Sequence, residues 1–301
     1  MEQNPQSNLN HLFVFGLGYT GKALSHLLKA QGWKVSGTSR NQESADQLAD
    51  EGFYSYVFNE TTPLEPAILD GVTHILLSIP PNDDGDLVFK AHAQDFSKRA
   101  KNLKWVGYLS TTGVYGDRQG DWVDETSDLA PSTKRGEKRV LAEKQWFDLY
   151  EASDVPVHSF RLAGIYGAGS NQLEKVASGK AKRRIKQGQV FSRIHVEDIA
   201  GMLEASIKSP NPGQAYNICD DEAAPPQDVV TYAAELLGVE PPEEIQFNPN
   251  DMTPMGLSFF AESKRVSNEK IKAELGYQLK YPTYREGLKA LLPTVGKAKG
   301  K

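Results

Sequence analysis

The sequence has a single cysteine, no long apolar stretch and no excess of basic residues, and each of these absences excludes a specialised class of protein. Cys219 is the only cysteine among 301 residues, so no disulfide can form within the chain, which fits a reducing compartment. No stretch is long and apolar enough to span a bilayer, and residues 1–10 are polar, without a signal-peptide core. Basic residues are not in excess, because the net charge is -5, which disfavours nucleic-acid and membrane partners. We therefore expect a cytoplasmic protein whose tails, 1–10 and 296–301, are disordered.

The strongest local pattern lies near the start of the chain, where an apolar run passes through a glycine-rich turn into a helical pattern. The turn reads Gly16-Leu-Gly18-Tyr19-Thr20-Gly21. In such a turn Gly16 permits the sharp bend, Gly18 lets the backbone approach a pyrophosphate, and Gly21 lets the helix pack closely on the strand. The N–H groups of the first helical turn would hold the phosphates. The sequence therefore predicts a dinucleotide-binding turn, with Tyr19 and Thr20 also in contact with the cofactor.

The end of the second predicted strand, 34–38, indicates which dinucleotide binds. In this fold an Asp or Glu about 20 residues past the glycines binds the ribose 2′-hydroxyl of NAD. Here the place is filled by Gly37-Thr38-Ser39-Arg40, which has no carboxylate. Ser39 and Arg40 are suited to clasp a 2′-phosphate, so NADP(H) is favoured over NAD(H). The alternative for Arg40 is an ordinary solvated loop arginine.

Apolar strand patterns alternate with helical patterns through the first half of the chain. The predicted strands are 12–15, 34–38, 54–58, 74–78, 105–109 and 155–162, and the intervening helices include 42–51, 87–103 and 134–152. This alternation predicts an α/β fold, a Rossmann-like doubly wound parallel sheet. The fourth strand ends in Ser78, Ile79 and Pro80, a stiff loop at the edge of the sheet where a cofactor lies, so we expect these residues to contact it.

The clean alternation stops after residue 167, and a small, mostly helical substrate lobe is predicted. We expect a dinucleotide-binding domain at 11–167, completed by about 190–219, and a lobe formed by 168–189 and 220–292. The helices predicted in this part of the chain are 170–188, 194–206, 229–237, 266–275 and 284–292. The basic run 180–184 is interpreted as a solvated face, with a ligand-phosphate site as the alternative. Cys219 follows an apolar run and is predicted to be a buried structural thiol.

Several motifs in a fixed order now point to a family. They are Phe15-Gly-Leu-Gly-Tyr-Thr-Gly21, Ser110-Thr-Thr-Gly-Val-Tyr-Gly116, Arg161-Leu-Ala-Gly-Ile-Tyr-Gly167, Ile194-His-Val-Glu-Asp198 and Ala215-Tyr-Asn-Ile218. Together they resemble the extended short-chain dehydrogenase/reductases of the NAD-dependent epimerase/dehydratase type, from 11 to about 292. The resemblance also implies a homodimer, in which 87–103 and 134–152 would pair between two copies.

The resemblance implies a catalytic tyrosine, a lysine four residues later and a serine or threonine after the fifth strand. Thr111 fills the third place, but Arg135 and Arg139 stand at the first two, and an arginine cannot act as a general base. The chain thus resembles an atypical subgroup without the active-site tyrosine. Thr111, Tyr115 and Arg139 are the catalytic candidates, Arg139 also as a ligand of the cofactor ribose. Tyr115 belongs to a motif that more often packs or lines the pocket.

Two functions remain open at this point. The first is an NADP(H)-dependent oxidoreductase or epimerase-type enzyme that acts on a small polar, sugar-like substrate by a non-standard proton-transfer route. The second is a non-catalytic sensor or regulatory protein that binds NADP(H), suggested by the two arginines at the tyrosine and lysine places. No cluster of metal-ligating side chains has the spacing of a metal site, so none is predicted.

Overall fold

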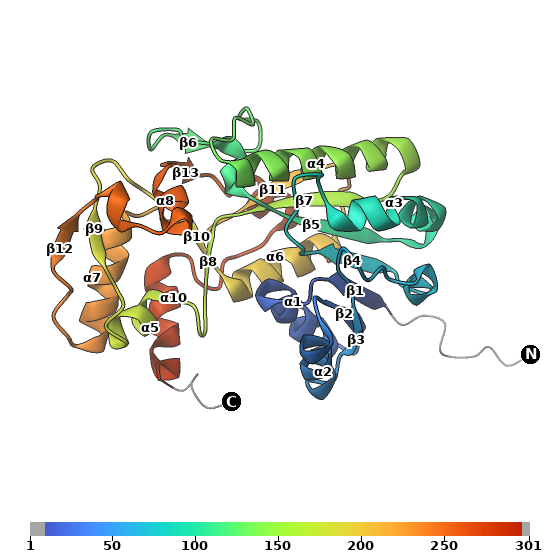
Figure 1. Ribbon diagram of the computed structural model, residues 1–301, viewed down its shortest axis with the longest axis horizontal. Helices are drawn as coiled ribbons and strands as arrows, with labels where there is room; N and C mark the ends of the chain where they lie inside the picture. Colours follow the sequence, from blue (N-terminus) through green and yellow to red (C-terminus); the bar gives the residue numbers. More distant parts are fainter. Residues whose placement is uncertain (1–9, 297–301) are drawn as a thin grey trace, which may run out of the picture. The chain divides into compact units, whose positions relative to one another are not determined.

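The computed structural model describes residues 10–296, which form an α/β fold around a seven-stranded sheet. The order of the strands across the sheet is β11-β7-β5-β4-β1-β2-β3, and every registered pair (β1–β2, β1–β4, β2–β3 and β4–β5) is parallel (Figure 1). The order reverses between β1 and β4, which is the switch point of a doubly wound sheet. The strands are β1 (His11–Phe15), β2 (Lys34–Ser39), β3 (Tyr54–Val57), β4 (His74–Leu77), β5 (Trp105–Thr111), β7 (Val157–Leu162) and β11 (Ala215–Ile218). The predicted fold class is confirmed.

The chain divides into two compact units, each made of separate segments of sequence. Unit 1 contains the described residues up to Ser110 together with Lys138–Phe160 and Ala200–Ala215. Unit 2 contains Thr111–Glu137, Arg161–Ile199 and the described residues from Tyr216 onward. The domain limits expected from the sequence stay a prediction, and the expected disordered tails fall almost wholly outside the described residues. Within residues 10–296, no helix combines the length and apolar character needed to cross a bilayer.

The core of unit 1 lies between the sheet and the helices that cover it. The five residues of β1 are all buried, as expected for a strand of a parallel sheet covered on both faces. On one face Phe96 and Trp146 pack with their ring centroids 5.5 Å apart, and both belong to one apolar cluster with Phe15 of β1. These side chains come from α3 and α4, which run beside each other over that face (Figure 1). The helices are α1 (Tyr19–Ala30), α2 (Gln42–Asp50), α3 (Leu87–Arg99), α4 (Lys134–Ser153) and α6 (Val196–Lys208).

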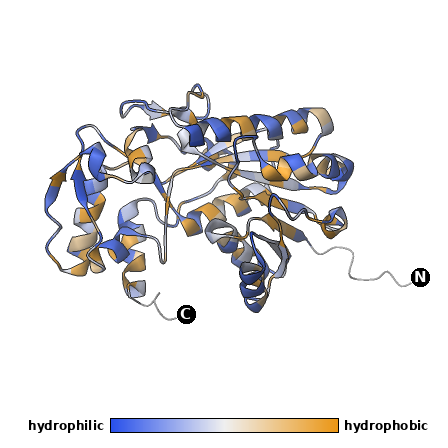
Figure 2. Ribbon diagram, viewed as in Figure 1, coloured by the Kyte–Doolittle hydropathy of each residue, from blue (hydrophilic) through white to orange (hydrophobic). Residues whose placement is uncertain are grey.

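Unit 2 combines short parallel strand pairs with small helices. The pairs are β8 with β10, β9 with β12, and β6 with β13. Leu173, Val229 and Leu288 belong to a separate apolar cluster beneath α5, α7 and α10, and Figure 2 shows these helices with hydrophobic and hydrophilic residues in alternation. The elements are β6 (Trp122–Val123), β8 (Gly164–Tyr166), α5 (Gln172–Ala177), β9 (Arg183–Ile185), β10 (Arg193–His195), α7 (Pro226–Leu237), β12 (Glu244–Gln246), α8 (Pro254–Phe260), β13 (Arg265–Val266), α9 (Glu269–Leu275) and α10 (Tyr284–Leu291).

Two predicted helices are shorter than the sequence indicated. The segment 170–188 is helical only in α5, because Asn171 caps its start and Gly179, at φ +66°, follows its end. Of the basic run beyond it, the two lysines are exposed, as expected for a solvated face, but Arg183 and Arg184 belong to β9, where Arg183 pairs with Glu244 and Arg184 is buried. Similarly, 266–275 is helical only from residue 269, since the preceding residues pair with β6.

Candidate functional site

The glycine turn lies between β1 and α1 in unit 1, as the sequence predicted. Gly16 has φ +82°, a left-handed conformation that favours glycine, and a Cβ there would lie 2.8 Å from the Cγ1 atom of Ile79. Its N–H donates a hydrogen bond of 3.0 Å to the Oγ1 atom of Thr38 on β2. The sharp turn is therefore fixed by both neighbouring strands.

Gly18 and Gly21 have contrasting surroundings. A Cβ on Gly18 would meet no atom closer than the carbonyl oxygen of Gly16 at 3.9 Å, whereas a Cβ on Gly21 would lie 2.9 Å from Cγ1 of Val14. Gly21 is thus required for close packing of α1 on β1, but Gly18 is not required by any neighbour within the chain. Gly18 is also the N-cap of a helix whose start has no side-chain cap, and both Gly18 and Tyr19 are exposed. Gly18 and the uncapped first turn of α1 therefore fit the pyrophosphate of a dinucleotide.

The loop after β4 contacts this turn, while the expected contact of Ser78, Ile79 and Pro80 with the cofactor stays a prediction. The N–H of Ser78 donates a 2.9 Å bond to the carbonyl of Phe15, which extends the sheet by one residue. Ile79 packs against Gly16, and Pro80 is exposed. Ser78 and Ile79 therefore line one side of the glycine turn.

The end of β2 presents Arg40 to solvent. The hydroxyl of Ser39 donates to the carbonyl of Asn41 at 2.9 Å, and the side chain of Asn59 donates to the carbonyl of Arg40 at 2.9 Å. The backbone at this position is consequently held in place. Within the described residues, the guanidinium of Arg40 makes no hydrogen bond or ion pair, so it is available to an external anion.

Arg139 lies on α4 and is buried in unit 1. Its guanidinium donates to the carbonyl of Leu109 and, at 3.3 Å, to the hydroxyl of Tyr108, both on β5. Its Nε atom is buried and has no partner among the described residues. Such a buried donor requires an acceptor, and a ribose hydroxyl is one that the predicted cofactor would supply.

Thr111, the last residue of β5, and Tyr115, which follows that strand, lie in unit 2, and their surroundings differ. Thr111 is partly exposed, and its hydroxyl accepts a 3.2 Å hydrogen bond from the N–H of Gly113. Tyr115 is fully buried, and its hydroxyl donates to Oδ1 of Asn217 at 2.8 Å while accepting from Arg161 at 2.9 Å. Burial raises the pKa of Tyr115 to about 12. The geometry thus favours a packing role for Tyr115.

Two further side chains that can exchange a proton, Tyr166 and His195, are also buried. Tyr166 of β8 packs edge-on against His195 of β10, with ring centroids 5.2 Å apart. Burial raises the pKa of Tyr166 and lowers that of His195 to about 4, so neither exchanges a proton near neutral pH. Cys219 is buried as predicted, and burial raises the pKa of its thiol.

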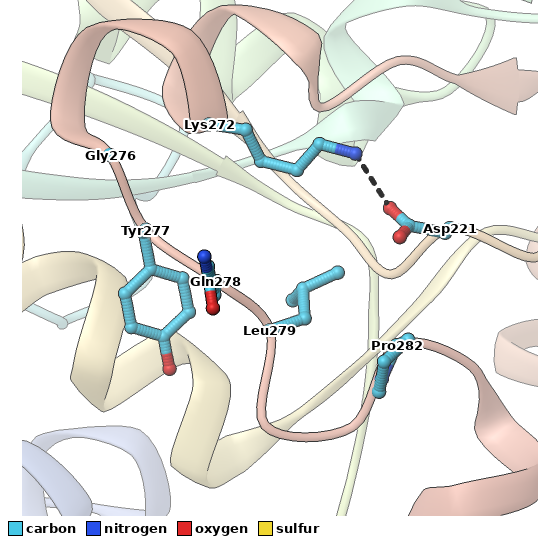
Figure 3. Close-up of a pocket in the computed structure, with 7 residues that line it drawn as sticks. All are labelled: Asp221, Lys272, Gly276, Tyr277, Gln278, Leu279 and Pro282. Carbon is cyan, nitrogen blue, oxygen red and sulfur yellow. Dashed lines mark hydrogen bonds and ion pairs between the residues drawn. The ribbon is translucent and has the colours of Figure 1, made fainter.

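Unit 2 also has a surface pocket of about 540 Å³ that no sequence pattern indicated (Figure 3). Lys272 and Asp221 point toward each other across it, 3.1 Å apart, and Asn268 also donates to Asp221 at 2.8 Å. The charges facing this pocket are therefore already paired.

The ion pair between Glu262 and Lys264 is a second feature of unit 2 that sequence reasoning missed. Its only sign in the sequence is the run Glu-Ser-Lys before β13.

Comparison with known proteins places this geometry in a structural class. No protein-family model matches the chain. A functionally unknown conserved protein from Silicibacter pomeroyi superimposes with a TM-score of 0.87 at 49% identity, over 96% of this chain and 99% of that one. The dTDP-glucose 4,6-dehydratase from Bacillus anthracis, solved in complex with NAD, superimposes with a TM-score of 0.74 at 19% identity, over 96% and 97% of the two chains. The fold is accordingly that of the NAD-dependent epimerases and dehydratases.

The sequence relationship is more specific than the fold. Protein YeeZ from Escherichia coli K12 is 30% identical over 282 residues, which cover 89% of this chain and 95% of that protein. The chain belongs to the same family as YeeZ.

Proposed function

We propose that the glycine turn of unit 1 binds a nicotinamide dinucleotide. The observation that carries this proposal is the contrast between Gly18 and Gly21, because a glycine that no internal neighbour demands lies at the position where a pyrophosphate approaches. Ser78, Ile79 and Pro80 bound the same turn. In this proposal Tyr19 and Thr20, at the start of α1, contact the phosphates, and Arg139 donates its unpartnered Nε–H to the ribose.

The preferred form of the cofactor in this proposal is NADP(H). Arg40 supports it, since this exposed guanidinium follows β2 where NAD-specific members of the fold carry a carboxylate. In this proposal the hydroxyl of Ser39, which donates to the carbonyl of Asn41 in the structure, turns to donate to the same phosphate. A guanidinium binds a phosphate through two parallel hydrogen bonds. The ribose of NAD carries no 2′-phosphate that could accept them.

The reaction that we propose is the oxidation or reduction of a carbonyl group on a small polar, sugar-like substrate. When bound, the cofactor supplies or accepts the hydride. Thr111 polarises the substrate oxygen through its hydroxyl, which lies on a partly exposed residue at the end of β5. Because Arg135 stands in the place of the family tyrosine, the proton follows a different route, and Tyr115 serves packing rather than proton transfer.

A sensor that binds NADP(H) without turnover is the second candidate, and the arginines 135 and 139 favour it. Transfer of deuterium from C4-deuterated NADPH to a panel of aldehydes and ketones distinguishes the two functions. We expect deuterium in an alcohol product for the enzyme. Tight NADPH binding with no transfer to any carbonyl would identify the sensor. Cytoplasmic location and the homodimer through α3 and α4 stay predictions.

A further inference from the structure

A second, smaller pocket of unit 2 lies beside β6, which pairs with β13 (Figure 1). Its volume is about 280 Å³, and its lining residues are Trp122, Val123, Asp124, Ser127 and Ser267. The N–H of Ser267 donates a 2.9 Å hydrogen bond to the carbonyl of Val123, which extends the pairing beyond the end of β6. Val123 is buried, whereas Trp122 and Asp124 are exposed. Because side chains alternate along extended backbone, Trp122 and Asp124 project from the same side, about 7 Å apart.

The indole ring of Trp122 has a free face at this pocket. Trp122 is 63% exposed, whereas Trp105 and Trp146 are fully buried. Among residues 10–296, no lysine or arginine lies over the ring of Trp122 and no aromatic ring packs against it. Tyr54 of unit 1 is as exposed, but the ammonium of Lys34 already lies 5.7 Å from the centroid of its ring. The face of Trp122 is therefore open to a cation, and tryptophan attracts cations more strongly than the other aromatic side chains.

The carboxylate of Asp124 is held in place through one of its two oxygen atoms. Oδ1 accepts hydrogen bonds of 2.7 Å from the hydroxyl of Thr126, 3.0 Å from the N–H of Thr126 and 3.2 Å from the hydroxyl of Ser127. These bonds, above all that from the hydroxyl of Thr126, lower the pKa of Asp124, so the carboxylate is ionised at neutral pH. Oδ2 accepts no hydrogen bond and forms no ion pair within the described part of the chain. The charge of Asp124 is thus fixed in position and lacks a partner.

This combination favours a positively charged ligand over a neutral or a negative one. An ammonium ion is attracted both by the face of an indole ring and by a carboxylate. A neutral sugar can lie on the ring but leaves the charge of Asp124 unpaired, and an anion is repelled by it. The volume is just below the range of about 300–1,000 Å³ that is typical of sites for drug-sized ligands, so a small charged group is the better fit.

We propose that Trp122 and Asp124 bind the ammonium group of a small organic amine. The cation lies on the indole face, and Oδ2 of Asp124 supplies the opposite charge. Ser127 is a positioning residue, since its hydroxyl donates to Oδ1 of Asp124 and accepts a 3.0 Å hydrogen bond from the N–H of the same residue. The site lies wholly in unit 2, so it goes beyond the proposed cofactor site and does not depend on it.

The test is a titration of the full chain with tetramethylammonium chloride and with propylammonium chloride, followed by the NMR signals of the indole N–H groups. The chain has four tryptophans, and Trp122→Leu identifies the signal of Trp122 by removing it. We expect this signal to shift saturably with both salts, while the signals of Trp33, Trp105 and Trp146 stay in place. Sodium chloride at the same ionic strength is expected to leave all four signals unchanged.

Two variants separate the carboxylate of Asp124 from the general charge of the surface. Asp124→Asn is expected to weaken tetramethylammonium binding at least about threefold, because the partner charge is lost. Glu269→Gln is the matched control, since it removes the same charge two residues from Ser267, from a carboxylate that Lys272 already pairs with at 3.0 Å. We expect wild-type affinity in this control. Calorimetry of Trp122→Leu is expected to show binding weakened about two- to fivefold.

Three results would overturn this site. The first is a Trp122 signal that neither ammonium salt moves, or that sodium chloride moves equally. The second is a shift of that signal by glucose but by neither ammonium salt, which would assign the pocket to a neutral ligand. The third is an equal loss of affinity in Asp124→Asn and Glu269→Gln. The proposed function fails separately, through absence of NADPH binding, and that outcome leaves the result of this titration unaffected.

Discussion

The hydroxyl of Tyr115 donates a 2.8 Å hydrogen bond to Oδ1 of Asn217, which joins the segment after β5 to strand β11 within unit 2. Arg161 donates to the same hydroxyl and lies over the ring, 5.1 Å from its centroid. A phenol held in this way is a structural element, because both its donor and its acceptor capacity are in use.

Removing this hydroxyl is therefore expected to lower stability and leave function unchanged. In Tyr115→Phe the buried Asn217 and Arg161 each lose a partner, which costs about 1–3 kcal/mol in the free energy of unfolding. Denaturant titration measures the loss, and calorimetry is expected to show wild-type affinity for NADPH. Folding as stable as wild type, with turnover abolished, would instead make Tyr115 a catalytic residue.

The two glycines of the turn are expected to respond differently to the same substitution. Gly18→Ala adds a methyl group where no internal atom is closer than 3.9 Å, so the melting temperature is retained while NADPH affinity falls at least about tenfold. Gly21→Ala forces its methyl group to 2.9 Å from Val14 and destabilises the fold by about 1–3 kcal/mol. Each variant is the control for the other. Equal NADPH affinity in Gly18→Ala and wild type would place the pyrophosphate elsewhere.

Asp220, after β11, is expected to give the protein a pH-dependent stability. Burial is the main cause that raises the pKa of this carboxyl from 3.8 to about 8, and the neighbouring Arg193 opposes the shift. The folded state therefore keeps a proton that the unfolded state loses, and the free energy of unfolding falls as pH rises from about 4 to 8.

Denaturation of Asp220→Asn at several pH values measures this contribution. Because an amide does not titrate, the variant is expected to lack the part of the fall in the free energy of unfolding with pH that Asp220 contributes. This holds whatever the absolute stability of the variant. A slope between pH 4 and 8 identical to that of the wild type would show that Asp220 is ionised in the folded protein.

The sequence predicted the central sheet well because its strands are short apolar runs at regular spacing, such as 12–15 and 74–78. It predicted less well the segments whose conformation depends on distant partners. Arg183–Ile185 forms a strand only because residues 244–246 pair with it, and a basic run carries no sign of that pairing. Lys264 and Glu262 were missed for the same reason, since their partners, Ser132 and Gly116, are far away in sequence.

Calorimetric titration of the wild type and Arg40→Ala with NADP⁺, NADPH, NAD⁺ and NADH tests the central claim most directly. We expect the wild type to prefer the phosphorylated forms, and Arg40→Ala to lose about 10- to 100-fold in NADPH affinity because charge-assisted bonds to the 2′-phosphate disappear. NADH affinity should be the same in both proteins. Binding of none of the four nucleotides, or an unchanged preference in Arg40→Ala, would contradict the assignment of the glycine turn and Arg40 to NADP(H).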